Sequence, residues 1–237
     1  IAHRALLLNS LARGISVVRG IPAGDDVRAT ERCLKNLGVQ IERINSSSDV
    51  QIHGSEGNLR ESVYNLDAGN SGTTMRLLAG LLASQSFFSV LTGDKSLRSR
   101  PMGRIIEPLK RMGAKVIARD SNSKPPLVIV GGELSGIDHI SKVASAQVKS
   151  AILIAGIFAN GKTIVREPFQ SRDHTERLLK AMGAVINGND TVISMEQSEL
   201  SPVDIRVPGD ISAAAFWIVL GICHPNAEIR VSGVGIN

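Results

Sequence analysis

Three segments of this chain end in almost the same way, and this recurrence constrains the fold more than any other feature. They read LKNLGV at 34–39, LKRMGA at 109–114 and LKAMGA at 179–184. Each predicts the end of an amphipathic helix, because a glycine at that position readily adopts the left-handed conformation that terminates helices. Apolar residues then alternate with polar ones, as in VQI at 39–41, which indicates a strand.

A second kind of helix alternates with the first and is apolar on every side. Its four copies are RALLLNSLA from Arg4, MRLLAGLLA from Met75, KSAILIAGIFA from Lys149 and SAAAFWIVLGIC from Ser212. A helix without a polar face is expected to be buried. Each copy is followed by an extended segment, namely ISVVRG, FFSVLTG, KTIVREP and EIRVSG.

Two helix types in a constant order predict an α/β unit that occurs three times, with a period of roughly 70 residues. We expect the apolar helices inside and the amphipathic ones facing water. The chain is expected to begin within one unit and to stop at 234–237 where another loop should start. The pattern therefore predicts a piece of a longer protein.

Composition excludes several classes of protein. The chain has 27 Lys and Arg against 22 Asp and Glu, but only 3% aromatic residues and no long basic run. An acidic metabolite accounts for this charge at least as well as nucleic acid does, and we expect no nucleic-acid partner. The longest apolar run, 211–223, is too short to cross a bilayer, so no membrane association is expected. Two cysteines, Cys33 and Cys223, predict buried thiols without disulfides and a cytoplasmic protein.

Two glycine-bounded stretches suggest an anion-binding site. Residues 67–73 read DAGNSGT and precede an apolar helix that carries Arg76 in its first turn. Residues 93–104, GDKSLRSRPMGR, supply four basic side chains. Backbone N–H groups at a helix start, hydroxyls and arginines all suit a small polyanion. These stretches predict that the chain handles a phosphorylated or carboxylated small molecule.

Equivalent corners of the other units carry similar side chains: SAQVKS at 145–150, PGDIS at 208–212 and EPFQSRDH at 167–174. Serines at helix starts ordinarily act as N-caps worth about 1 kcal/mol, and Ser71, Ser145 and Ser212 fit that role. Capping does not explain the neighbouring donors, which are Arg76, Arg100, Gln147, Lys149 and Arg172. His174 is predicted as a partly exposed residue in a first helical turn. The sequence contains no Ser/His/Asp arrangement, metal-ligand spacing, GxGxxG or nucleotide P-loop.

Five long motifs carry a specific resemblance, in a constant order across nearly the whole chain. They are LDAGNSGTTMRLLAGLLA, GDKSLRSRPMGRIIEPLKRMGA, SAQVKSAILIAG, EPFQSRDHTERLLKAMGA and VPGDISAAAFW. Together they resemble the 5-enolpyruvylshikimate-3-phosphate synthase family, particularly its glyphosate-tolerant bacterial branch.

The resemblance implies a transferase of the shikimate pathway, in the biosynthesis of chorismate and aromatic amino acids. Such enzymes transfer the enolpyruvyl group of phosphoenolpyruvate to the 5-hydroxyl of shikimate 3-phosphate and release phosphate. The implied steps are protonation of the methylene group, attack by the hydroxyl, a tetrahedral intermediate and phosphate loss. No metal or organic cofactor is implied, and a monomer is expected. The implied α/β fold is one domain of three βαβαββ units around a pseudo-threefold axis, with buried parallel helices.

The same resemblance implies roles for individual residues. The residues implied for shikimate 3-phosphate are Arg4, Ser145, Ala146, Gln147 and Arg172. The turn at Gly72 and Thr73, together with Arg100, is implied for phosphoenolpyruvate and for its inhibitor glyphosate. Further candidates are Asn70, Arg76 and Ser171.

The resemblance also indicates what the chain lacks. Residues 1–237 correspond to the N-terminal domain, and 1–12 and 226–237 are expected at the hinge to a C-terminal domain. That half carries the proton-transfer aspartate and further basic residues, so the chain is expected to bind shikimate 3-phosphate without turnover. The alternatives are a binding-only domain and the UDP-N-acetylglucosamine enolpyruvyl transferase of the same fold. The latter uses a loop cysteine, whereas Cys33 and Cys223 lie in predicted helices.

Overall fold

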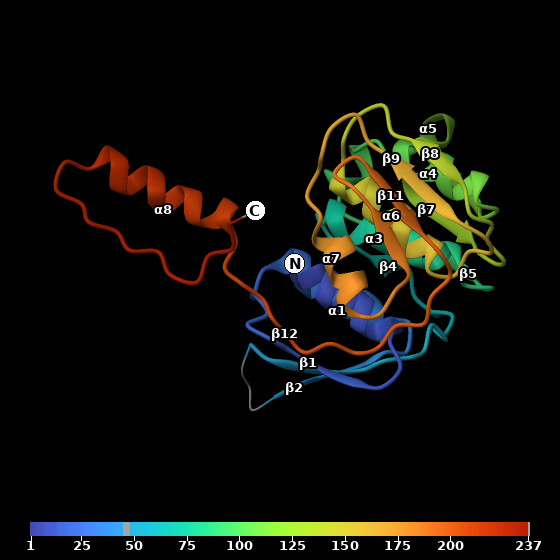
Figure 1. Cartoon of the computed structure of the whole chain (residues 1–237), viewed down its shortest axis with the longest axis horizontal. Helices are drawn as coiled ribbons and strands as arrows, with labels where there is room; N and C mark the ends of the chain where they lie inside the picture. Colours follow the sequence, from blue (N-terminus) through green and yellow to red (C-terminus); the bar gives the residue numbers. More distant parts are fainter. Residues whose placement is uncertain (45–47, 237) are drawn as a thin grey trace.

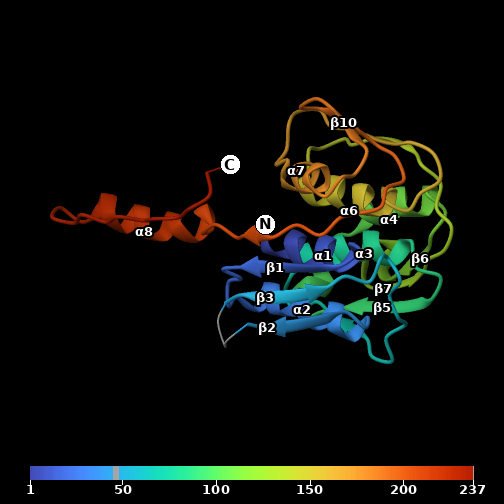
Figure 2. The ribbon, with the colours of Figure 1, turned by 60° about the horizontal axis from the view of Figure 1, so that its bottom comes forward.

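The computed structural model of the chain describes residues 1–44 and 48–236. Three helices lie inside the molecule: α1 (Ala2–Leu11), α3 (Gly72–Ala83) and α6 (Ala146–Gly156). In Figure 2, α1 and α3 lie between strands β1 and β3 on one side and helices α6 and α7 on the other. A Cβ at Gly80 would lie 2.2 Å from the carbonyl oxygen of Ala151, so glycine permits the close contact between α3 and α6.

Three amphipathic helices surround the inner ones. They are α2 (Asp25–Asn36), α4 (Gly103–Arg111) and α7 (His174–Ala181). Helix α2 contacts α1 and α3, α4 contacts α3 and α6, and α7 contacts α1. The three glycines that follow them, Gly38, Gly113 and Gly183, have φ values of 89°, 116° and 88°. The predicted left-handed helix ends are therefore confirmed.

The strands form three four-stranded sheets. One contains β4 (Leu66–Asp67), β5 (Phe88–Thr92), β7 (Lys124–Val130) and β6 (Lys115–Ala118), in that order. The second has the order β10 (Ile186–Gly188), β11 (Val192–Met195), β9 (Thr163–Arg166) and β8 (Asp138–Ile140). The third has the order β12 (Ile205–Arg206), β1 (Ile15–Arg19), β3 (Val50–His53) and β2 (Gln40–Arg43).

Each sheet has one parallel pair, which is formed by the first two strands of a unit. Strand β4 runs parallel to β5, and β8 runs parallel to β9, whereas the other pairs of each sheet are antiparallel. Strand β12 pairs in parallel with β1, so that Ile205 lies opposite Val18 and the ring closes (Figure 1). The chain thus forms two complete βαβαββ units and a third whose first strand, β12, comes from its far end. This arrangement confirms the predicted threefold α/β architecture.

One of the four apolar helices is not buried, contrary to the prediction. Helix α8 (Ile211–Cys223) projects away from the ring of sheets (Figure 1). Phe216 is 79% exposed and Trp217 is 59% exposed, and Ala214 is the one buried residue of this helix. The prediction was wrong because an apolar sequence shows only that a helix is stabilised by apolar packing partners, and not that the chain supplies them. Of the described residues, a returning segment that includes Ile229 packs beside it, near Gly221.

Two smaller predictions about this end of the chain also fail. The Cys223 thiol is exposed along with α8, whereas Cys33 is buried as expected. The segment EIRVSG forms no strand, and the nearest pairing is an isolated bridge between Gly209 and Val234. Short helical turns at Leu97–Ser99 and Arg119–Asn122 complete the elements. Among residues 1–44 and 48–236, we find no helix with the length and hydrophobicity that a bilayer crossing requires.

Candidate functional site

The glycine-rich turn before α3 is held to the start of α6 by one carboxamide. Ser71 caps α3 as predicted, because its hydroxyl accepts a hydrogen bond of 3.1 Å from the Thr74 N–H. The Gln147 Nε2 donates to Thr73 Oγ1 at 2.7 Å, and Gln147 Oε1 accepts from Arg76 Nη1 at 2.7 Å. Both ends of the Gln147 side chain are therefore engaged, which fixes the turn relative to α6.

Two guanidinium groups face this turn where it lacks a side chain. A Cβ at Gly72 would lie 2.7 Å from Arg76 Nη1 and 3.2 Å from Arg100 Nη1. Arg100 donates to the Asn70 carboxamide oxygen, and Asn70 in turn donates to Asp94 Oδ2 at 2.6 Å. Burial, followed by the positive charges of Arg100 and Arg104, lowers the pKa of Arg76. The turn is thus a site of positive potential.

Arg4 supplies a second positive centre on α1. Its side chain is largely buried and donates from Nε to Thr175 Oγ1 at 2.6 Å and from Nη2 to Ser150 Oγ at 3.0 Å. Burial and the nearby charge of Arg172 lower the Arg4 pKa to about 10. Arg4 and Arg172 both line a hollow of about 380 Å³, together with Thr73 and Gln147.

A second hollow of about 450 Å³ shares two residues with the first. Its walls are 144–147 on one side and 169–172 on the other. Gln147 and Arg172 line both hollows, so the two adjoin. Every residue that the sequence predicts for shikimate 3-phosphate therefore lines one of these hollows. Gly72 and Arg100 do not line them, and they connect to them through Arg76 and Gln147.

The arginines of this region lack ion-pair contacts, although the nearby charge of Glu176 favours the ionised form of Arg4. Within the described ranges 1–44 and 48–236, Arg4, Arg76, Arg100 and Arg172 form no ion pair with a carboxylate. Arginines that line or adjoin a hollow without an ion-pair partner favour an anionic ligand. His174 is half-buried at the start of α7, as predicted, and burial together with positive neighbours that include Arg4 lowers its pKa.

Lys149 does not belong with the donors that face the hollows. It is 1% exposed, and its amine pairs with Glu167 and Glu176. Ser212 does not cap α8, because the Asp210 carboxylate accepts from the Ser212 N–H instead. Ser145 does cap α6, although its contact with the Val148 N–H is long at 3.5 Å.

Sequence reasoning missed two residues at the site. His3 lines the first hollow and contacts Thr30 Oγ1 at 2.7 Å, and burial lowers its pKa to about 4. The carboxylate of Glu167 contacts the backbone of Ser145 and the hydroxyl of Ser171. The signal that could have found Glu167 is Lys149, because a charge inside an apolar helix requires a buried partner.

Comparison with known proteins decides the family. A sequence model of EPSP synthase (3-phosphoshikimate 1-carboxyvinyltransferase) matches residues 1–237. The chain belongs to the EPSP synthase family. It is 50% identical over 240 residues to the 3-phosphoshikimate 1-carboxyvinyltransferase of Gloeobacter violaceus, and 48% identical over 237 residues to that of Alkaliphilus metalliredigens. All of this chain is covered in both comparisons, with 55% and 56% of those relatives.

A solved structure of the EPSP synthase family supports the fold directly. The EPSP synthase from Acinetobacter baumannii superposes on the whole of this chain with a TM-score of 0.90 and 43% sequence identity, over 54% of its own length. The chain thus spans about half the length of the relatives that it matches. Its ring of three units corresponds to a domain-sized part of the two-domain EPSP synthase fold.

Proposed function

We propose that the chain forms one wall of the active site of a 3-phosphoshikimate 1-carboxyvinyltransferase. In this proposal the enolpyruvyl group of phosphoenolpyruvate passes to the 5-hydroxyl of shikimate 3-phosphate, and phosphate is released. The observation that carries the proposal is the pair of positive centres linked by Gln147. Arg4 and Arg172 lie on one side, Arg76 and Arg100 lie on the other, and none forms an ion-pair contact with a carboxylate of the described residues.

Each centre has its own ligand in the proposal. Shikimate 3-phosphate occupies the hollows lined by Arg4, Ser145, Ala146, Gln147 and Arg172, with Ser171 beside them. The phosphate and carboxylate groups of phosphoenolpyruvate, or of the inhibitor glyphosate, meet the turn at Gly72 and Thr73 with Arg76, Arg100 and Asn70. Arginine suits these groups because its planar donors pair with two oxygens at once.

The chain alone binds but does not turn over in this proposal. Relatives are almost twice as long, and the remaining half would supply the groups that transfer protons and neutralise the rest of the ligand charge. That half would also cover the exposed apolar residues of α8, with 1–12 and 226–237 at the hinge. The complete protein is proposed to be a monomer. The unpaired thiols of Cys33 and Cys223 support a reducing, cytoplasmic setting.

No specific observation favours the UDP-N-acetylglucosamine enolpyruvyl transferase. That reaction is expected to use a reactive loop cysteine, whereas Cys33 lies in α2 and is 1% exposed. Burial raises the pKa of its thiol to about 12, so the reactive thiolate is not formed near neutral pH. Cys223 ends α8 and lines neither hollow.

Calorimetric titration of the chain with shikimate 3-phosphate tests the proposal. Binding should be measurable and should weaken about tenfold or more when Arg172→Ala removes a cation from the hollows. Arg206→Ala serves as a matched control, because Arg206 lines neither hollow. Equal affinity in the Arg172→Ala variant and the unaltered chain would show that the assignment is wrong.

A further inference from the structure

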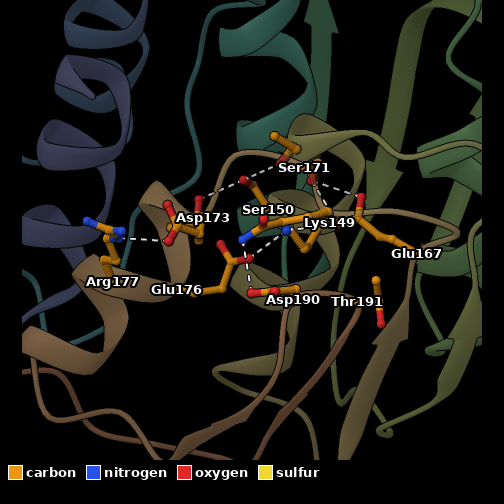
Figure 3. Close-up of polar contacts among 12 residues, drawn as sticks. Lys149, Ser150, Glu167, Ser171, Asp173, Glu176, Arg177, Asp190 and Thr191 are labelled. Carbon is orange, nitrogen blue, oxygen red and sulfur yellow. Dashed lines mark hydrogen bonds and ion pairs between the residues drawn. The ribbon is translucent and has the colours of Figure 1, made fainter. Parts of the chain in front are cut away.

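Lys149 carries a buried amine within the apolar helix α6. The residue is 1% exposed. Its Nζ lies 2.8 Å from Glu167 Oε2 and 2.6 Å from Glu176 Oε1 (Figure 3). Burial of an unpaired ammonium group would strongly destabilise the folded chain. The two carboxylates therefore make it possible for a charged lysine to be buried here.

Glu167 makes contacts that its role as a counter-charge does not require. Its side chain is 2% exposed. Its Oε1 accepts from the Ser145 N–H at 2.8 Å and from the Ser171 hydroxyl at 2.9 Å, and its Oε2 lies 2.7 Å from the same hydroxyl. Its own N–H donates to the Thr191 carbonyl at 2.8 Å, which ties this part of the chain to the start of β11. The carboxylate is therefore held from several sides.

The two segments that Glu167 joins are the two walls of the second hollow. Ser145 belongs to the wall formed by 144–147, and Ser171, which Figure 3 draws beside Glu167, belongs to the wall formed by 169–172. Neither Glu167 nor Lys149 lines the hollow itself. One buried carboxylate thus connects both walls without facing the space between them.

Glu176 has a different place in the cluster. It lies in the first turn of α7, and neither of its oxygens accepts a well-aligned hydrogen bond from a described residue. It supplies negative charge close to Lys149, and its charge also favours the ionised form of Arg4. Glu176 therefore balances charge, while Glu167 also holds backbone and hydroxyl groups in place.

We propose that Glu167, paired with Lys149, is a positioning residue that sets the separation of the two walls of the shikimate 3-phosphate site. This inference rests on the proposed function for the identity of the ligand. Glu167 touches no ligand and acts through Ser145 and Ser171. The proposed binding residue Gln147 lies two positions after Ser145, and the proposed binding residue Arg172 lies one position after Ser171. Loss of the carboxylate bridge would leave both free to shift.

The decisive comparison is between two substitutions of the same chemistry in the 237-residue chain. Glu167→Gln removes the charge and disturbs the bridge, and the affinity for shikimate 3-phosphate should fall about tenfold in calorimetry. Glu176→Gln removes the other buried charge but leaves the bridge, and a clearly smaller loss is expected. Glu196→Gln is the control, because it alters an exposed pair with Lys162 at 3.4 Å.

A second measurement does not depend on the ligand. Hydrogen exchange of the Ser145 amide reports directly on its bond to Glu167. Exchange of this amide should be about tenfold faster in Glu167→Gln, while amides later in α6 should keep their protection. If Glu167→Gln does not fold, Glu167→Asp keeps the charge but withdraws the carboxylate by one methylene, and the same changes are expected.

The outcomes separate this inference from the proposed function. Absence of shikimate 3-phosphate binding in the unaltered chain contradicts the proposed function, and the Ser145 exchange then still tests the bridge. Normal binding combined with unchanged affinity in Glu167→Gln overturns the positioning role alone. Equal losses in Glu167→Gln and Glu176→Gln also overturn it, because they would mean that the cluster acts only through charge. Unchanged exchange at Ser145 overturns it as well.

Discussion

Arg76 Nη1 and Gln147 Oε1, which lie 71 positions apart in the sequence, form a hydrogen bond of 2.7 Å. This bond connects the first turn of α3 to the first turn of α6. Gln147 also donates to Thr73, and it lines both hollows together with Arg172, so one side chain belongs to the turn and to the hollows. The position of the turn before α3 therefore depends on the start of α6.

Gln147→Ala should weaken the binding of both shikimate 3-phosphate and phosphoenolpyruvate. Removal of the amide frees Arg76 and Thr73 and deletes a donor from both hollows, so the affinity for shikimate 3-phosphate should fall about tenfold. Gln147→Glu should cost more, because its carboxylate would pair with Arg76 and reduce the positive potential. Calorimetry measures both effects, with Gln51→Ala on β3 as the control. Similar affinities in Gln147→Ala and Gln51→Ala would contradict the linking role.

Gly72→Ala should affect phosphoenolpyruvate more than shikimate 3-phosphate. The added methyl group would lie 2.7 Å from Arg76 Nη1 and 3.2 Å from Arg100 Nη1, so both guanidinium groups must shift. In an assembled enzyme, we expect KM for phosphoenolpyruvate to rise about tenfold while KM for shikimate 3-phosphate changes little. Gly103→Ala is the matched control, because a Cβ there meets nothing within 4 Å. Equal changes in both KM values would contradict this assignment.

Stability should depend on pH through the Lys149 cluster. Burial opposes ionisation of Glu167, but hydrogen bonds from Lys149, Ser171 and the Ser145 N–H outweigh it and lower the Glu167 pKa below its ordinary value of 4.5. A lowered carboxyl pKa adds stability that is present above 4.5 and is lost as pH falls through the folded-state value. Burial also lowers the Lys149 pKa, but the carboxylates of Glu167 and Glu176 outweigh it and raise the value above 10.5.

Urea unfolding from about pH 6 to about pH 3 measures this contribution. The free energy of unfolding should fall more steeply with acid in the unaltered chain than in Glu167→Gln, so the two curves converge. Glu176 and Arg4 face the same cluster and are present in both proteins. Parallel curves would show that Glu167 does not have a lowered pKa.

Helix α8 should make the isolated chain prone to self-association. Its exposed side chains include Phe216 and Trp217, and a continuous apolar surface of this kind favours association. Phe216→Ser should reduce light scattering at high protein concentration. Tyr64→Ser, at a site that is 70% exposed but away from α8, should leave it unchanged. Equal scattering in all three proteins would contradict the prediction.

The fold was predictable because its repeat is local. Gly38, Gly113 and Gly183 each end a helix by their own backbone conformation, so the signal does not depend on distant parts of the chain. The closing pair of strands, with Ile205 beside Val18, was less accessible, since nothing near either residue indicates its partner.

The exposure of α8 could not be predicted, for a physical reason. An apolar sequence shows that a helix would be stabilised by packing against other apolar residues. It does not show whether the described residues of the chain pack against it, because that depends on the tertiary structure. The Glu167 bridge escaped prediction for a related reason. The lysine at position 149 indicates that buried carboxylates lie nearby. The packing of α6, α7 and β9 determines which acidic residues contact its amine, and the sequence does not show this packing.

Reconstitution of the complete active site tests the central claim most directly. The chain would be mixed with the part of the Gloeobacter violaceus relative that lies outside the matched region, and phosphate release from phosphoenolpyruvate would be measured with shikimate 3-phosphate present. We predict no turnover by either polypeptide alone, and turnover by the mixture that is lost with Arg172→Ala. Rapid phosphate release by this chain alone would contradict the account, because it would show that one wall is sufficient.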